Sequence, residues 1–211
     1  MKRFELSLLI GLVVSLLLSS FTAFAEDCEE VRNHMVRLHV LANSDSQEDQ
    51  LLKLAVRDAV LSGTADVFAH SRDEAKAKEC ALKNLDRIER IARAELDAQG
   101  CSDAVRAELV NMFFDTRTYD GITVPAGQYD AVRIVIGEGK GKNWWCILFP
   151  PLCVPAAGGN NGGEIAEQLE LLGQVPQYTP KFAVLELVEG IREKLEHPQN
   201  EAEKELLKQQ G

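Results

Sequence analysis

One stretch of 17 residues, Gly137–Cys153, constrains the fold more than any other part of the chain. Its sequence is GEGKGKNWWCILFPPLC, with three alternating glycines, two lysines, two adjacent tryptophans, a proline pair and two cysteines. The glycines are typical of a hairpin loop that needs positive φ angles. The apolar run Trp144–Phe149 indicates a β-strand that Pro150-Pro151 ends. This stretch therefore predicts a tight loop followed by a strand.

Three earlier stretches also have the patterns of strands. Val36–Ala42 places apolar residues on one side at a period of two, which predicts a half-buried strand. Ala104–Phe114 is rich in Val, Leu and Phe, which strands favour. Gln128–Ile136 carries apolar residues on both sides, which indicates a central strand.

Two helices are predicted between the first and second strands. The first follows Asn43–Ser46, whose side chains can cap a helix, and we expect it to end near Leu61 at Ser62-Gly63-Thr64. The second covers Arg72–Gln99 and has an apolar stripe at helical spacing. The order β-α-α-β-β-β predicts an α+β fold with a small, mostly antiparallel sheet and two helices packed on one face.

The composition changes after Cys153. Residues 154–180 contain the run AAGGNNGG and are predicted to form a flexible Gly/Asn linker with a short helix. Residues 181–211 are predicted to form a C-terminal helix and a polar tail. The apolar residues of this helix recur at helical spacing: Val184, Leu187, Val188, Ile191 and Leu195. We therefore expect an α+β domain over residues 26–153 with a helical appendage.

Residues 1–25 have the pattern of a signal peptide. Lys2 and Arg3 precede the apolar run Leu6–Leu18, and Ala23-Phe24-Ala25 has the small-x-small pattern of a cleavage site. The run of 13 residues is shorter than the ~20 that span a bilayer. We predict export with cleavage after Ala25, and an uncleaved membrane anchor is the alternative.

Charge and motifs exclude several classes of function. The formal net charge is −10, so nucleic acid is an unfavourable partner. The glycine loop matches neither phosphate-binding fingerprint, and H-E-x-x-H and G-x-S-x-G are absent from the sequence. We predict no cofactor, no metal site, no small-molecule substrate and no enzymatic activity.

The stretch Gly137–Cys153 is also the candidate for partner binding. Its lysines can be presented to an acidic partner surface, although the loop can equally serve only to close a hairpin. Adjacent residues of a strand face opposite sides, so one tryptophan can lie in the core while the other reaches the surface, where tryptophan often dominates binding. Burial of both is the alternative. The candidate partner-binding residues are Gly139, Lys140, Gly141, Lys142, Asn143, Trp144, Trp145, Pro150 and Pro151.

The chain has five cysteines, an odd number for an oxidising compartment. Cys146 and Cys153 enclose ILFPPL and are a candidate disulfide, which would stabilise the fold by roughly 2–3 kcal/mol in the chain-entropy model. Buried free thiols and a redox pair are the alternatives. A redox pair would suggest a cell-envelope enzyme that uses the thiol chemistry of Cys146 and Cys153, although their spacing is not C-x-x-C. A scaffold that only binds wall or membrane is a third interpretation.

Two sequence blocks and the export signal resemble the stage II sporulation protein R family of endospore-forming bacteria. The blocks are Arg37–Leu61, RLHVLANSDSQEDQLLKLAVRDAVL, and Pro125–Cys153, PAGQYDAVRIVIGEGKGKNWWCILFPPLC. The resemblance implies a signalling protein, without enzymatic activity, secreted from the forespore into the intermembrane space. Its implied partner is a membrane-embedded aspartic protease of the mother-cell membrane, which processes the pro-form of mother-cell sigma factor E.

Overall fold

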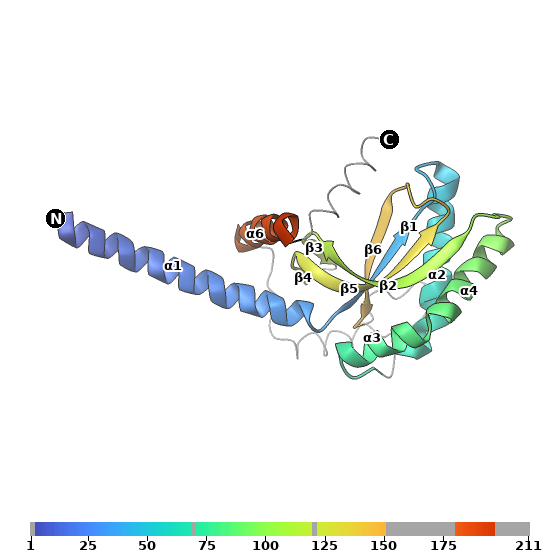
Figure 1. Ribbon diagram of the computed structural model, residues 1–211, viewed down its shortest axis with the longest axis horizontal. Helices are drawn as coiled ribbons and strands as arrows, with labels where there is room; N and C mark the ends of the chain where they lie inside the picture. The colour runs from blue at the N-terminus through green and yellow to red at the C-terminus, as the bar shows by residue number, and fades with distance from the viewer. Residues whose placement is uncertain (1–2, 69–70, 120–121, 151–179, 197–211) are drawn as a thin grey trace.

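The computed structural model describes residues 3–68, 71–119, 122–150 and 180–196. Within these residues the chain forms helices and strands in a mixed order (Figure 1). In chain order they are α1 (Arg3–Arg32), β1 (Val36–Leu41), α2 (Gln47–Phe68), α3 (Glu74–Lys83), α4 (Leu85–Ala98), β2 (Val105–Phe114), β3 (Arg117–Tyr119), β4 (Ile122–Val124), β5 (Gly127–Ile136), β6 (Asn143–Phe149) and α6 (Pro180–Glu196).

The main sheet has four strands in the order β2-β5-β1-β6. β5 pairs in parallel with β1 and antiparallel with β2, while β6 pairs antiparallel with β1. β5 is therefore a central strand, as its two apolar sides predicted, and β6 is an edge strand. A separate hairpin is formed by β3 and β4. The predicted α+β class with a mostly antiparallel sheet is confirmed.

The helices α2, α3 and α4 cover one face of this sheet (Figure 1). Leu38 and Val40 of β1, together with Val132 and Ile134 of β5, form the sheet side of an apolar core. The helices contribute Leu52, Val56, Val60, Phe68, Ala77, Ala81, Ile88, Ala92 and Leu96. Burial of these side chains is the main favourable term for this layer, at ~25 cal/mol per Å² of apolar surface.

The predicted end of the first helix near Leu61 is wrong, because α2 continues to Phe68. Thr64 does not stop the helix, since its hydroxyl donates to Val60 O at 2.7 Å. Gly63 is a contact residue rather than a cap: a Cβ there would lie 2.8 Å from Ile91 Cδ1 of α4. The glycine therefore lets α2 and α4 approach closely.

The predicted helix over Arg72–Gln99 is divided into α3 and α4 by Asn84, which has φ −113° and ψ 10°. Its side chain donates to Cys80 O at 2.8 Å, so it binds the last turn of α3. The predicted apolar stripe still faces the core in both helices.

The prediction that the first strand is half-buried is also wrong. Val36, Leu38 and Val40 face the helices, but Arg37 and His39 on the other side are 0% and 3% exposed. The Arg37 guanidinium lies 4.2 Å from the centre of the Phe114 ring, and its Nε donates to Cys146 O at 3.4 Å. The Phe114 ring and the Cys146 carbonyl oxygen thus stabilise the buried Arg37 cation, although the alternation of the strand predicted that Arg37 would face solvent.

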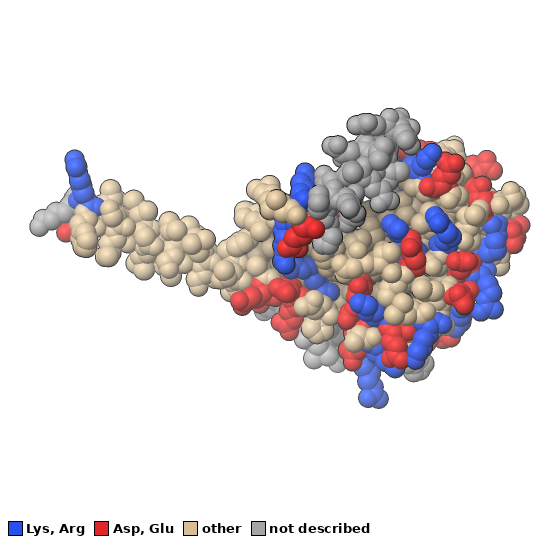
Figure 2. Space-filling view, viewed as in Figure 1, with Lys and Arg blue, Asp and Glu red and all other residues tan. Residues whose placement is uncertain are grey.

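The N-terminal helix α1 is continuous from Arg3 to Arg32 and passes through Ala25 without interruption. Residues 3–20 are exposed, and beyond its charged tip this part is a rod without charged side chains (Figure 2). The predicted helix near the C-terminus is confirmed as α6. The predicted linker with its short helix lies outside the described residues, except for Pro180, the first residue of α6. The predicted polar tail after Glu196 also lies outside them.

Candidate partner-binding surface

The glycine loop after β5 is packed onto the loop that follows β1. Lys140 N donates to Asn43 O at 3.1 Å, and Gly141 N donates to Ala42 O at 2.9 Å. Lys142 N donates to Asp45 Oδ1 at 2.6 Å. These bonds join two segments about 95 residues apart in the chain into one double loop, which fixes the backbone from which the two lysines project.

The glycines are required by this close packing. Gly137 has φ +57°, and a Cβ there would lie 2.2 Å from Asn43 Oδ1. A Cβ on Gly141 would lie 2.2 Å from the backbone oxygen of Ser44, and one on Gly139, at φ +65°, would lie 2.7 Å from Val135 Cγ1. Gly139 and Gly141 therefore have a structural role, because the loop has no room for a Cβ at either position. The side chains that the loop can offer to a partner are those of Lys140 and Lys142.

Lys53 of α2 lies beneath the double loop and is 4% exposed. Its Nζ donates to Lys142 O at 2.9 Å and to Gln50 Oε1 at 2.5 Å. Burial lowers the pKa of Lys53, and the nearby Asp45 carboxylate opposes this shift. A charged donor therefore holds the loop on α2. The sequence did not predict this contact, because the helical pattern places Lys53 opposite the apolar face of its helix.

The side chains of Lys140 and Lys142 project outward. Both residues are exposed, and Lys140 Nζ forms an ion pair with Glu138 Oε2 at 2.8 Å. Because this pair lies at the surface, a competing carboxylate of a partner can replace Glu138 at little cost. The loop can thus offer two cations to an acidic surface.

Trp144 and Trp145 face opposite sides of β6, as strand alternation predicted. Trp144 pairs with Val40 on the helix side of the sheet and is 37% exposed. The guanidinium of Arg57, from α2, lies 4.3 Å from the centre of a Trp144 ring, and its Nε binds Asp58 at 2.8 Å. This stacking restrains the indole while leaving part of it open to a partner.

Trp145 is half-buried on the other face of the sheet. Its ring stacks on His39 at 4.0 Å between centroids and 3° between planes, and it meets Phe114 edge-on at 4.8 Å. Burial lowers the pKa of His39 to about 4, an effect that the nearby Arg133 and Arg37 cations reinforce and a side-chain contact with Asn143 opposes. Trp145 therefore stacks on a neutral imidazole at neutral pH and belongs more to the core than to the surface.

The end of β6 contributes little open surface. Cys146 is disulfide-bonded and 5% exposed, and Pro150 is buried. Cys28, Cys80 and Cys101 are free. Pro151 and Cys153 lie outside the described residues, so the pairing of Cys146 with Cys153 stays a prediction. Among the residues that the structure describes, no group of three or more His, Cys, Asp and Glu side chains is arranged to hold a metal ion.

We give the name loop–Trp144 surface to the open part of this region, formed by Lys140, Lys142, Asn143, Trp144 and Arg57. Four of its members were predicted from the sequence, and Arg57, which comes from α2, was not. The position of Arg57 in its helix does not indicate this contact, because its partner Trp144 lies on a strand more than 80 residues later in the chain.

Comparisons with known proteins agree with the two resembling blocks. The family model described as stage II sporulation protein R matches residues 32–158. Stage II sporulation protein R of Bacillus subtilis (strain 168) is 35% identical over 171 residues, which cover 81% of this chain and 74% of that protein. No solved structure matches the chain. This chain therefore belongs to the stage II sporulation protein R family.

Proposed function

We propose that this protein is an exported signal of sporulation. In this proposal it is secreted from the forespore into the intermembrane space and activates a membrane-embedded aspartic protease of the mother-cell membrane. That protease then processes the pro-form of mother-cell sigma factor E. Membership of the sporulation family and an N-terminal apolar helix compatible with a signal sequence support this role.

We further propose that the loop–Trp144 surface contacts the protease. The observation that carries this step is the position of Trp144: an indole 37% exposed on an edge strand, restrained beneath Arg57 and next to two exposed lysines. Tryptophan and arginine are enriched at the energetic centres of interfaces. A restrained side chain also loses less entropy on binding than a mobile one.

Activation would follow from selective binding. A ligand shifts a protease toward its active conformation only if it binds that conformation more tightly. The double loop is held by backbone bonds on both sides, so its shape would change little on contact. We expect the lysines to face carboxylates that the protease presents in its active state, and Trp144 to fill an apolar pocket beside them.

A cell-envelope enzyme that uses the thiol chemistry of Cys146 and Cys153 is the second candidate. It is less well supported, because Cys146 is disulfide-bonded and buried, and the nucleophile in such chemistry is an accessible thiolate. Replacing both cysteines by serine separates the two roles. A folded variant without signalling would favour thiol chemistry, whereas loss of folding would favour a structural bond.

The contact surface is tested by sigma-factor processing in sporulating cells that express single variants. Lys140→Ala, Lys142→Ala and Trp144→Ala are each expected to reduce processing. Trp144→Ala should be the most severe, because in the proposed complex Trp144 becomes buried at the centre of the contact. Lys83→Ala, an exposed lysine of α3, is the matched control and should process normally. Export and folding are checked by immunoblot and limited proteolysis. Normal processing in all three variants would contradict the proposed surface.

A further inference from the structure

The helix α6 carries its apolar stripe on the outside. Val184, Leu187, Val188, Ile191 and Leu195 recur at helical spacing, so they form one face. All five are exposed, from 45% for Val188 to 77% for Leu195. A helix that packs on a soluble domain normally turns such a stripe inward. The exposed stripe therefore needs an apolar environment beyond the described part of the domain.

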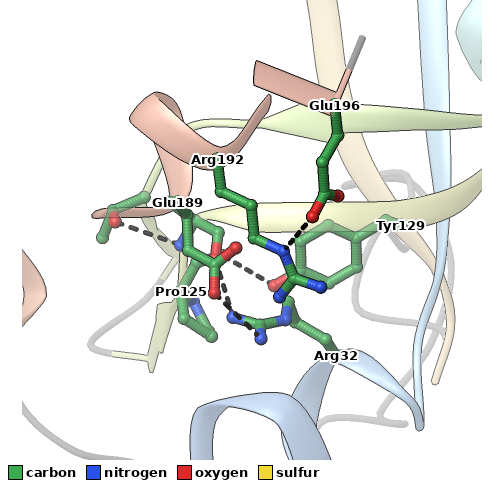
Figure 3. Close-up of polar contacts among 8 residues, drawn as sticks. Arg32, Pro125, Tyr129, Glu189, Arg192 and Glu196 are labelled. Atoms are coloured by element: carbon green, nitrogen blue, oxygen red, sulfur yellow. Dashed lines mark hydrogen bonds and ion pairs between the residues drawn. The ribbon is translucent and has the colours of Figure 1, made fainter. Parts of the chain in front are cut away.

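The opposite face of α6 holds the helix to the rest of the molecule. Phe182 and Leu185 are buried against Phe24 and Cys28 of α1. Glu189 forms an ion pair with Arg32 at 3.4 Å (Figure 3), and Glu193 accepts a hydrogen bond from Gln128 of β5. Arg32 also donates to Ala126 O at 3.0 Å. Since two inward contacts are polar and specific, the outward direction of the stripe is fixed by the fold.

The place of α6 along α1 suggests what covers the stripe. Among the described helices, α1 is the one long and apolar enough to cross a membrane. Its uninterrupted exposed stretch ends at Ser20, and the contact with α6 begins at Phe21. A span of ~20 residues from Arg3 would therefore leave the bilayer beside α6. In Figure 1, α6 is seen strongly foreshortened above α1, so the two helices cross rather than run side by side.

We propose that, in the uncleaved chain, α6 lies flat on the membrane that α1 enters, with its apolar stripe in the boundary between headgroups and acyl chains. Two basic residues, Arg192 and Lys194, flank the stripe on its two sides and are exposed. Arg192 forms a surface ion pair with Glu196 at 2.9 Å, which an anionic headgroup can replace at little cost. In Figure 2 the outer edge of the domain toward the free end of α1 is tan at α6, whereas charged side chains lie beside this edge and at the base of α1. While α1 is attached, α6 thus sets the orientation of the folded domain on the lipid surface.

The full-length chain, reconstituted into vesicles of phosphatidylethanolamine and phosphatidylglycerol, tests this arrangement by photo-crosslinking. Benzoylphenylalanine replaces one leucine at a time: Leu187 of α6, Leu8 of α1 as the membrane-embedded reference, or Leu82 of α3 as the matched control. Leu82 is 52% exposed and Leu187 is 64% exposed, so both leucines are open to solvent in the free protein. Lipid adducts are counted by mass spectrometry.

We expect lipid adducts at Leu187 to approach the yield at Leu8 and to exceed that at Leu82 by about 5-fold or more, because a helix in the interface buries its apolar face in lipid. A yield at Leu187 equal to that at Leu82 would overturn the proposal. So would crosslinks from Leu187 to a second copy of the chain, since these would assign the stripe to self-association. Neither result depends on protease activation, so failure here is distinguishable from failure of the proposed function.

Discussion

The helices α4 and α6 have comparable apolar stripes and use them in opposite ways. α4 buries Ile88, Ala92 and Leu96 against the sheet, at 1%, 0% and 0% exposure. α6 exposes its stripe and turns Glu189 and Glu193 inward, toward Arg32 and Gln128. The difference teaches that helical periodicity defines a face, whereas the neighbours of the helix decide whether that face is buried.

The largest contrast is expected from placing one charge in each stripe. Ile88→Asp introduces a buried carboxylate without a partner and should lower the free energy of unfolding by about 4 kcal/mol or more. Ile191→Asp changes an exposed residue and should lower it by at most about 0.5 kcal/mol. Urea denaturation of the full chain without detergent or lipid, followed by circular dichroism, measures both. Equal losses would show that the α6 stripe is buried against another part of the protein.

The second contrast concerns pH and belongs to the sheet rather than to α6. The pKa of His39 is about 4 in the folded protein and ordinarily near 6.5, so the unfolded chain binds the extra proton between these values. Stability contributed by neutral His39 is therefore present above pH ~6.5 and falls by roughly 3 kcal/mol as the pH drops to ~4.

His39→Phe should remove most of this pH dependence, and tryptophan fluorescence should report it because Trp145 stacks on the His39 ring. His34→Gln is the control, since His34 lies outside the stacked group and its Nδ1 contacts Glu30 O. If the pH dependence of stability were the same in His39→Phe as in the unmodified protein, His39 would not be its source.

The third contrast compares two glycines, Gly141 of the double loop and Gly190 of α6, by the space that each leaves for a Cβ. Gly141→Ala would place a Cβ 2.2 Å from Ser44 O, a backbone atom that cannot move freely, and should cost about 1–3 kcal/mol and loosen the double loop. Gly190 of α6 has nothing within 4 Å of such a Cβ, so Gly190→Ala should stabilise the helix by up to about 1 kcal/mol. Thermal unfolding measures both changes. Destabilisation by Gly190→Ala would mean that α6 is more closely packed than the structure shows.

The smallest effect is expected where α6 joins the domain. Arg32→Met removes the bond to Ala126 O and the ion pair with Glu189, at a cost of about 1–2 kcal/mol, and should increase amide exchange throughout α6. Arg192→Met breaks only the exposed pair with Glu196 and should leave exchange nearly unchanged. Equal exchange in the two variants would show that Arg32 does not hold the helix.

The candidate site could be predicted in part. The alternation of Trp144 and Trp145 and the exposure of the lysines follow from local chain geometry, so the sequence was sufficient for them. The positions of Lys53 and Arg57 were not predictable in this way, because their contacts are with residues brought close only by folding. The burial of Arg37 and His39 was missed for a similar reason: a polar residue at an alternate strand position normally faces water.

By itself the sequence determined the order along the chain of the four strands of the main sheet, the apolar stripe of each helix and the glycine positions that permit the double loop, but not the β3–β4 hairpin. These are local properties, set by backbone sterics and by the periods of helix and strand. Only the tertiary structure decided that α2 continues past Gly63, that both faces of β1 are buried and that α6 directs its stripe outward. Each of these depends on a partner distant in the chain, such as Ile91, Phe114 or Arg32, and a local pattern carries no information about which side that partner will occupy.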